Sequence, residues 1–405
     1  MANETRCCIA GGGPAGMMLG YLLARAGVDV TVLEKHIDFL RDFRGDTIHP
    51  STLELLHELG LLDRFLDLPH QEARQLMGMV GALKLTIADF SHLPTHCRFV
   101  VLMPQWDFLN FLAREAERFP SFKLRMQTQV TGLIEEAGIV RGVRAESPRG
   151  PIEIRADLVV GADGRHSSVR AASGLAVHDI GAPMDVLWFR LPRRQSDTAE
   201  TLGRFDRGAI MVVIDRGAYW QCALVISKGS IEDVRARGLQ AFRDRVAVML
   251  PFLGDRLDEI GSWDDVKLLT VGVDRLEQWY RPGVLCIGDA AHTMSPIGGV
   301  GINLAIQDAV AAANILAEPL RAGAPSIEHL RRVQKRRALP VRMTQALQVM
   351  IQKRVVARVL ASSAPLRPPL AVLLLSWFPF LRRFPARAIG LGVRPEHVRT
   401  PVAAA

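Results

Sequence analysis

A glycine-rich turn near the N-terminus has the spacing of a dinucleotide-binding loop. Residues Cys7–Ala10 predict a short buried strand, which runs into Gly11-Gly12-Gly13-Pro14-Ala15-Gly16, and Met17–Ala26 predicts the following helix. In G-x-G-x-x-G the first glycine permits a tight turn, the second lets the backbone approach a pyrophosphate, and the third allows helix and strand to pack closely. A second predicted strand, Val28–Leu33, ends at Glu34, whose carboxylate can accept hydrogen bonds from ribose hydroxyls. The unit predicts dinucleotide binding, and the acid favours an unphosphorylated ribose, as in FAD or NAD.

Two later segments also place acids where a buried strand turns into a helix. Residues 157–170 run from an apolar strand through Asp163 and Gly164 into a helix start, and residues 283–292 form a second such strand that delivers Asp289. The glycine-rich stretch 296–303 then precedes another helix, whose N-terminal N–H groups can face a ligand. Asp289 can bind a polyol hydroxyl. Several such sites in one chain suit one long ligand, such as FAD, that lies across a single sheet.

The three motifs in this order, over roughly residues 5–345, resemble the flavin-dependent aromatic hydroxylases of the para-hydroxybenzoate hydroxylase type. The resemblance implies an α/β fold: an FAD-binding Rossmann-like domain of the glutathione-reductase type, an inserted antiparallel β-sheet substrate domain, and C-terminal helices. It implies an enzyme that uses FAD, NADH or NADPH, and O2 to hydroxylate a phenolic, polyketide or quinone-like aromatic substrate through a flavin C4a-hydroperoxide. An isoprenoid-type reductase without oxygen insertion and an FAD-binding module without turnover stay open as alternatives.

The resemblance also implies roles for individual residues. Pro296 would present its carbonyl to the substrate and the flavin edge, and Arg44 would lie near the pyrophosphate and the flavin-side cavity; both are the predicted catalytic residues. Tyr219 and Pro296 are predicted substrate contacts, and no metal site is expected. The sequence does not identify a base for a phenol, and His49, His57 and His292 are predicted to be structural. The predicted cofactor-binding residues are Gly11, Gly13, Pro14, Ala15, Gly16, Glu34, Lys35, Arg44, Gln105, Val130, Asp163, Gly164, Asp289, Pro296, Gly299, Gly301, Ile302 and Asn303.

Segments with alternating apolar and polar residues interrupt the βαβ pattern and predict the inserted sheet. The FAD-binding domain is therefore predicted to be discontinuous, built from residues 1–72, 98–178 and 270–341. The substrate-binding sheet is assigned to residues 73–97 and 179–269, and residues 342–405 form a helical tail that is both basic and apolar.

The positive charge is confined to that end of the chain. The 50 Lys and Arg against 42 Asp and Glu give 50 − 42 = +8, yet residues 331–405 carry 15 Lys and Arg and one acid, Glu396, which leaves 8 − 14 = −6 for the rest. The acidic body and the lack of a recognition motif argue against a nucleic-acid partner. The tail either packs on the FAD-binding domain or binds a membrane surface through Trp377, Phe378 and Phe380, in the apolar run Leu370–Leu381.

The cellular location follows from the cysteines and from the start of the chain. Five cysteines without C-x-x-C spacing, and no basic and apolar leader, predict a reducing cytoplasm. Peripheral contact with the inner face of the membrane is the open alternative. Small-molecule substrate and O2 are the other expected partners, and the sequence leaves monomer and homodimer open.

Overall fold

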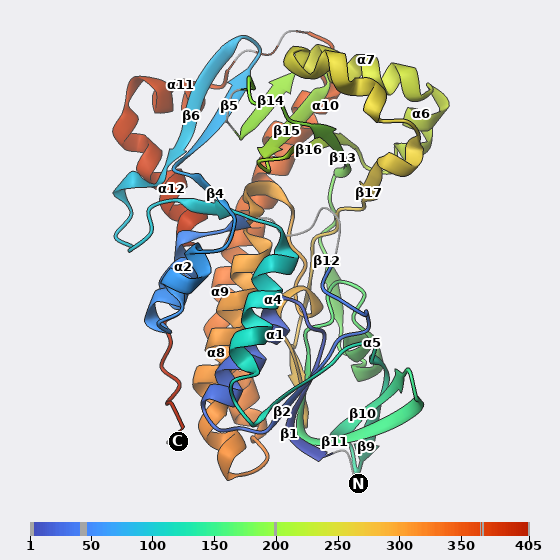
Figure 1. Cartoon of the computed structure of the whole chain (residues 1–405), viewed down its shortest axis with the longest axis vertical. Coiled ribbons are helices and arrows are strands. Elements are labelled where there is room, and N and C mark those ends of the chain that lie inside the picture. Colours follow the sequence, from blue (N-terminus) through green and yellow to red (C-terminus); the bar gives the residue numbers. More distant parts are fainter. Residues whose placement is uncertain (1–3, 41–46, 198–200, 365, 367, 404–405) are drawn as a thin grey trace.

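The computed structural model describes residues 4–40, 47–197, 201–364, 366 and 368–403. Two sheets lie toward opposite ends of the long axis of the molecule, and the longest helices run along that axis (Figure 1). The chain alternates between the two sheets rather than completing one before the other.

The first sheet has a parallel centre in the order β20-β11-β1-β2-β8. β2 reads Val-Thr-Val-Leu and is buried throughout, as expected for a parallel strand covered on both faces. The predicted strand–helix–strand start is confirmed as β1, α1 and β2. The strands of this sheet are β1 (Glu4–Ala10), β2 (Val30–Leu33), β8 (Phe122–Arg125), β9 (Gln129–Glu136), β10 (Ile139–Ser147), β11 (Gly150–Gly161), β19 (Tyr280–Arg281) and β20 (Val284–Cys286).

Helices cover the first sheet. α1 packs between α4 and α8, and α9 packs on α8 (Figure 1). α8 is the one helix among the described residues that is long and apolar enough to cross a membrane, but 67% of its most apolar window is buried, as in a core helix. The helices of this half are α1 (Pro14–Arg25), α2 (Pro50–Glu58), α3 (Leu62–Leu66), α4 (Gln105–Ala116), α5 (Ser168–Ser173), α8 (Gly301–Ala322) and α9 (Ile327–Ile351).

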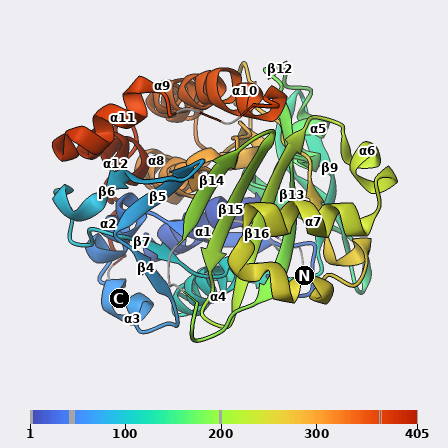
Figure 2. The same ribbon diagram turned by 90° about the horizontal axis from the view of Figure 1, so that it is seen from above.

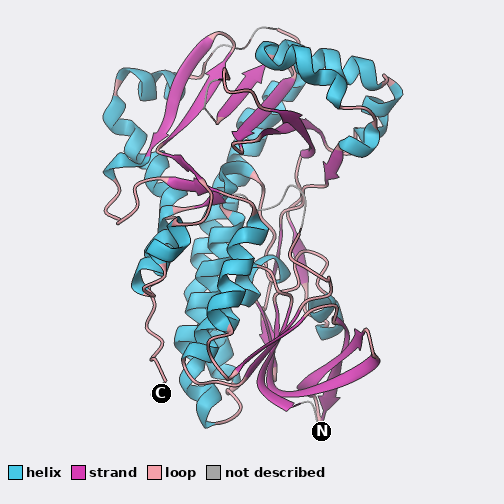
Figure 3. Ribbon diagram, viewed as in Figure 1, coloured by secondary structure: helices cyan, strands magenta, loops and turns pink. Residues whose placement is uncertain are grey.

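The second sheet has the order β17-β13-β16-β15-β14-β5-β6. Side chains alternate between two faces: Phe189, Trp220 and Leu224 belong to the core cluster that contains Phe242 of α7, whereas Val186, Ala223 and Val225 face the C-terminal helices. Figure 3 shows this sheet capped by helices on its outer side. Its strands and outer helices are β5 (Gln75–Val80), β6 (Leu83–Asp89), β13 (Met184–Pro192), β14 (Leu202–Asp206), β15 (Ala209–Asp215), β16 (Tyr219–Ser227), β17 (Lys267–Leu269), α6 (Ile231–Ala236) and α7 (Leu239–Met249).

Short strands and short helical segments join the two halves. The small sheets are β3 (Thr47–Ile48) with β7 (Val100–Leu102) and β4 (Gln71–Ala73), and β12 (Val177–Asp179) with β18 (Asp274–Leu276). Short 3₁₀-helical segments span Phe90–His92, Pro251–Glu259, Trp263–Asp265, Gly288–Ala290, Ile297–Gly299 and Pro379–Arg382.

The C-terminal helices run from the first sheet to the second. A π-helical stretch, Gln352–Val356, links α9 to α10 (Ala357–Ala361), and α11 (Leu370–Trp377) and α12 (Arg383–Gly390) pack against β6. The predicted boundary at residue 342 falls inside α9, because the buried face of that helix continues through Gln345 and Gln348. The body and the tail are therefore joined by one continuous helix.

Candidate functional site

Three adjacent parallel strands deliver the three sequence motifs to one edge of the first sheet. Ala10 at the end of β1 pairs with Gly161 of β11, which pairs with Cys286 of β20. A Cβ added to Gly11 would lie 2.4 Å from the carbonyl oxygen of Ala162, so the first two turns touch. In open parallel sheets this carboxyl-end edge is where ligands bind.

The glycine loop leaves room for an anion at the start of α1. Gly11 has φ +102°, and a Cβ on Gly16 would lie 1.9 Å from the Gly11 carbonyl oxygen, so both positions need glycine. A Cβ on Gly13 would meet nothing closer than 4.0 Å. Pro14 opens α1, no side chain caps the helix, and its first turn, with Ala15, has no acid. The free N–H groups and the helix dipole can therefore receive a phosphate at Gly13.

The next predicted residues border this loop. The Glu34 carboxylate follows β2, is buried, and accepts hydrogen bonds from the N–H groups of Gly12 (3.0 Å) and His36 (3.0 Å), whereas Lys35 is exposed. Val130 is buried on β9, and Gln105 is the first residue of α4. Arg44, the predicted catalytic arginine, lies outside the described residues.

Asp163 uses its carboxylate to cap α5. Its oxygens accept hydrogen bonds from the N–H groups of Ser168 (2.7 Å) and Val169 (3.2 Å) and from the Ser167 hydroxyl. Burial raises the pKa of Asp163 above its usual value, although these hydrogen bonds oppose the shift. Asp163 therefore fixes the conformation of the turn. Gly164, which follows it, has φ +82°, and an added Cβ there would have no protein atom within 4 Å.

Beside that turn lies a cation-rich hollow of ≈ 380 Å³, lined by Arg165, His166 and Arg170 among others. The Arg165 guanidinium donates to the Thr270 carbonyl (3.0 Å) and lies 3.9 Å from Asp289 of the third motif. The hollow thus opens next to the edge where the motifs meet.

The loop after the third motif is tied to β3. A Cβ on Gly299 would lie 2.4 Å from Oγ1 of Thr47, and that hydroxyl donates to the Gly299 carbonyl (3.0 Å). The carbonyl of Pro296 accepts the N–H of Gly299 (3.0 Å), which leaves one lone pair for another donor. The N–H groups of Gly301 and Ile302 open α8, which has no side-chain cap.

The side chain of Asn303 links α8 to β3 and to α2 by hydrogen bonds. Its Oδ1 accepts from the N–H of His49 (2.8 Å) and from the Thr52 hydroxyl (2.8 Å), and its Nδ2 donates to the Thr47 carbonyl (3.1 Å). His49 is buried, and its Nδ1 lies 2.8 Å from the carbonyl of Ile389. Burial lowers the pKa of His49 to about 4, so this ring is neutral and structural.

Three glutamines on α9 and at the start of the π-helical stretch hold the Pro296 loop and the residues just before it, and they were not predicted from the sequence. The Gln348 amide donates to the carbonyls of Ser295 (3.0 Å) and Ile297 (3.0 Å), and Gln352 donates to the Ser295 hydroxyl (2.8 Å). Gln345 donates to the Thr293 carbonyl (3.0 Å). Their spacing of three and four residues was the available signal, because it places three amides on one helix face.

The face of the second sheet that meets the Pro296 loop is apolar. Trp188, Ala223, Val212, Gly203 and Gly78 lie opposite one another across five neighbouring strands. Ile297, next to Pro296, packs with the cluster that contains Trp188 and Val212. This row spans the sheet beside the loop.

Tyr219, the predicted substrate contact, lies on the same face but nearer the end of the sheet. Its ring is 4.9 Å from the guanidinium of Arg190. One alternate position along β16, Gln221, separates it from Ala223 of the row. β16 is an interior strand, so Tyr219 does not lie on an edge of the sheet.

These residues fit FAD. The open Gly13, the uncapped starts of α1 and α8, and the carboxylates of Glu34 and Asp289 at one sheet edge match a pyrophosphate flanked by polyol groups. Among the described residues, no group of three or more His, Cys, Asp or Glu could hold a metal ion.

Comparison with known proteins agrees with this site. The family model described as "FAD binding domain" matches residues 4–347. The chain is 34% identical to 6-methylpretetramide 4-monooxygenase of Streptomyces rimosus, over 91% of this chain and 88% of that protein. It is 30% identical to 12-dehydrotetracycline 5-monooxygenase/anhydrotetracycline 6-monooxygenase of S. rimosus subsp. rimosus, over 75% and 60%. The solved structure of the anhydrotetracycline hydroxylase OxyS of S. rimosus superposes with a TM-score of 0.74 at 26% identity, over 99% and 78%.

The chain therefore belongs to the FAD binding domain family, and it is an FAD-dependent monooxygenase of the aromatic hydroxylase type. For six further relatives, the chain spans only 56% to 66% of the relative's length.

Proposed function

We propose that this enzyme hydroxylates a polycyclic aromatic polyketide with several fused rings. The observation that carries the proposal is the 34% identity to a 6-methylpretetramide monooxygenase across most of both chains. The apolar row from Trp188 to Gly203 supports it, because it places an apolar sheet face beside Ile297 and the Pro296 loop.

The nicotinamide co-substrate is proposed to be NADH or NADPH, docked in the hollow beside Asp163. Arg165, His166 and Arg170 line this hollow and provide donors for a pyrophosphate. Arg170 is already 3.3 Å from Asp274, which holds its guanidinium in place.

The protein's part in the reaction is to bind, orient and exclude water. Bound FAD supplies the hydride acceptance and oxygen activation of this enzyme class. The start of α1 would hold the pyrophosphate and the start of α8 the flavin end of the cofactor, and Pro296 and Ile297 would border the ring and the substrate. Gln345, Gln348 and Gln352 would fix that border, and the apolar row would keep water away from the reacting carbon.

We also propose the two-domain division, with residues 73–97 and 179–269 as the substrate domain. β5, β6 and β13–β17 fall within these segments. A reducing, cytoplasmic location is proposed because all five cysteines are buried free thiols.

The test is turnover with the flavin-loaded protein under air. NADH and NADPH oxidation would be followed with fused-ring phenols and with single-ring phenols, and products would be analysed by mass spectrometry with isotopically labelled O2. Incorporation of one labelled oxygen atom into a fused-ring product supports the proposal. A preference for single-ring phenols would contradict the substrate class, and turnover without oxygen incorporation would favour a reductase.

A further inference from the structure

The outward face of α9 is apolar in the middle and basic at both ends. Its four large apolar side chains recur every three or four residues and are 43% to 52% exposed: Leu339, Met343, Leu347 and Met350. The exposed cations before and after them are Arg332, Lys335, Lys353 and Arg354. A helix of a globular protein normally keeps polar residues on its solvent face.

A second group of exposed apolar side chains lies on and between α11 and α12. The four aromatic rings are 46% to 69% exposed: Trp377, Phe378, Phe380 and Phe384. Arg383 and Arg387 share the exposed side of α12 with Phe384. Aromatic rings of this size are usually among the most buried side chains.

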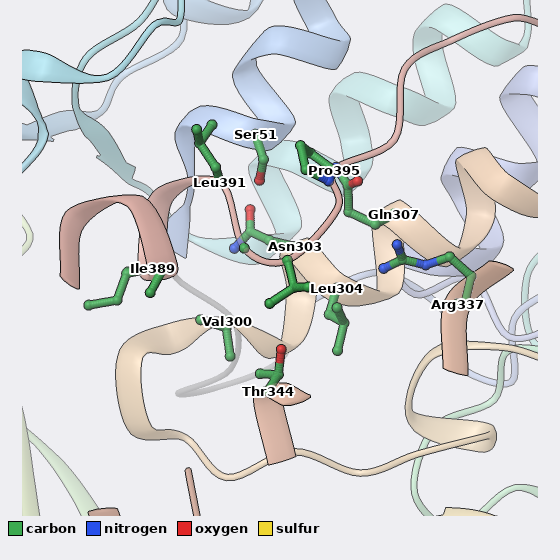
Figure 4. A pocket seen from close by; sticks show the side chains of 13 residues that line it. Ser51, Val300, Asn303, Leu304, Gln307, Arg337, Thr344, Ile389, Leu391 and Pro395 are labelled. Carbon is green, nitrogen blue, oxygen red and sulfur yellow. The ribbon is translucent and has the colours of Figure 1, made fainter. Parts of the chain in front are cut away.

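The two groups belong to one side of the molecule. The C-terminal helices, orange to red in Figure 2, gather along one side when the molecule is seen from above. Thr344 of α9 and Ala388 of α12 line the same small cavity, which Figure 4 shows between α8, α9 and the C-terminal segment. We call the exposed residues of α9, α11, α12 and the Phe378–Phe380 turn the basic-aromatic face.

The cations of this face are not neutralised by the protein. No Asp or Glu occurs between residues 331 and 395. Within the described part of the chain, no acid pairs with the eight exposed cations Arg332, Lys335, Arg342, Lys353, Arg354, Arg358, Arg383 and Arg387. The face therefore carries a positive potential around an apolar centre.

We propose that the basic-aromatic face docks on an anionic lipid bilayer. Trp and Phe side chains enter the boundary between headgroups and acyl chains, while Lys and Arg bind anionic headgroups. A second copy of the chain fits this face poorly, because a two-fold interface would place the same cations opposite one another. α11, with eight residues, is too short to span the bilayer, so the contact is peripheral.

Docking would bring the reaction site close to the lipid. The inner face of α9 holds the Pro296 loop through Gln348, and a Cβ on Gly298 would lie 4.0 Å from Ile389 of α12. The helices that face the bilayer are therefore the helices that support the site. An apolar, fused-ring substrate, as in the proposed function, concentrates in the bilayer. Docking therefore shortens the distance that the substrate travels from the bilayer to the reaction site.

The experiment is flotation of the flavin-loaded, full-length protein with vesicles. Vesicles of phosphatidylcholine alone are compared with vesicles that also contain phosphatidylglycerol, at low and high salt. We expect flotation with the anionic vesicles only, and its loss at high salt. Equal flotation with both vesicle types, or none with either, would overturn the proposal.

Variants separate the aromatic from the electrostatic contribution. The double substitution Trp377→Ser/Phe384→Ser should weaken vesicle partitioning at least tenfold, and Arg383→Gln/Arg387→Gln about 30-fold, because each cation contributes about fivefold. The control is Arg237→Gln/Val248→Ser, which removes an exposed cation and an exposed apolar side chain near α7. Flavin content and turnover of soluble substrate should stay unchanged in all of them. If the face variants float like the control, or if wild type is a dimer that Phe384→Ser splits, the proposal fails.

Discussion

The Nε atom of Arg337 lies 2.9 Å from Oδ1 of Asp308, and neither side chain is more than 1% exposed. The second carboxylate oxygen of Asp308 accepts the N–H of Gly288 (3.1 Å) and lies 2.5 Å from Nε2 of His292. Burial alone would raise the pKa of Asp308, but His292 and Arg337 together bring it below its usual value. One buried carboxylate thus links α9 to the turn that presents Asp289.

This link continues to the C-terminal segment. Arg337 also lies 3.4 Å from Glu396, and Arg336 lies 2.6 Å from the same carboxylate. The N–H of Glu396 donates to the side-chain oxygen of Gln307, one residue before Asp308. These contacts hold Glu396 and the C-terminal segment around it against α8 and α9, and α8 is the helix that starts at the candidate flavin site.

Replacement of Asp308 by Asn should destabilise the protein by about 3–5 kcal/mol, because it leaves the buried Arg337 guanidinium with only the more distant Glu396 carboxylate (3.4 Å) as counter-charge. Urea unfolding of the wild type and the variant measures this loss. The matched control is Glu328→Gln. It breaks the exposed Glu328–Arg331 pair (3.3 Å) on α9, the helix that carries Arg337, and should cost at most about 1 kcal/mol. Equal losses in the two variants would show that burial does not strengthen the pair.

Substitution Gly13→Ala should impair FAD binding without unfolding the protein. Gly13 has φ −74° and extended backbone geometry, which alanine adopts, and the added methyl meets no protein atom closer than 4.0 Å. The methyl instead occupies the space where the backbone would approach the pyrophosphate, so the FAD dissociation constant should rise about tenfold or more. Titration of the apoprotein with FAD measures it.

The control for this variant is Gly254→Ala, where an added Cβ has no neighbour within 4 Å and the residue lies far along the chain from the motif turns. Both variants should unfold in urea within about 0.5 kcal/mol of the wild type. If Gly13→Ala binds FAD as tightly as Gly254→Ala does, the pyrophosphate does not lie at the start of α1.

Local sequence pattern was enough to predict the glycine-rich turn, because the contacts that require glycine there are made between residues close in sequence. Gly11 needs a positive φ and Gly16 needs to touch Gly11, and both requirements lie within six residues of chain. The same holds for β1, α1 and β2, whose apolar runs match buried parallel strands and a covering helix.

The residues that hold the site in place could not be predicted from local sequence pattern. Asp308 and Arg337 are 29 residues apart on two helices, and nothing near either residue shows that they meet in the core. Gln348 reaches back 53 residues to Ser295. The predicted boundary at residue 342 falls inside α9, because the buried face of that helix runs without a break from Leu330 through Val341 to Gln348.

Substitution Gln348→Met should uncouple turnover while FAD stays bound. The methionine keeps the volume of the side chain but loses the hydrogen bonds to Ser295 and Ile297, so the Pro296 loop is held less firmly. Small misplacements at a reaction site lower rates by about ten- to a hundredfold. We therefore expect a fall of that size in product formed, with NAD(P)H oxidation reduced much less.

The measurement is the ratio of hydroxylated product to NAD(P)H consumed. Gln240→Met, an exposed glutamine of α7, is the matched control and should keep the wild-type ratio. If Gln348→Met also keeps that ratio, the glutamine supports the helix but does not position the loop.

The protein should lose stability between pH 6.5 and pH 4 partly because of His49. Burial lowers the pKa of His49 from 6.5 to about 4 in the folded state. As the pH falls through this window, the unfolded chain takes up a proton at His49 while the folded protein does not. The contribution is fully present above pH 6.5 and is lost as the pH falls, by about 2 kcal/mol between pH 7 and pH 5.

His49→Asn removes the titrating ring but keeps a donor that can reach the Ile389 carbonyl, so its free energy of unfolding should fall about 2 kcal/mol less than that of the wild type between these two pH values. His70→Asn is the control, because His70 also lies 2.7 Å from a backbone carbonyl, that of Leu68, but is only half-buried. Urea unfolding at pH 7 and pH 5 gives the comparison. Parallel losses in wild type and His49→Asn would mean that the folded protein accommodates a charged His49, and that the contact between α2 and α12 does not depend on a neutral ring.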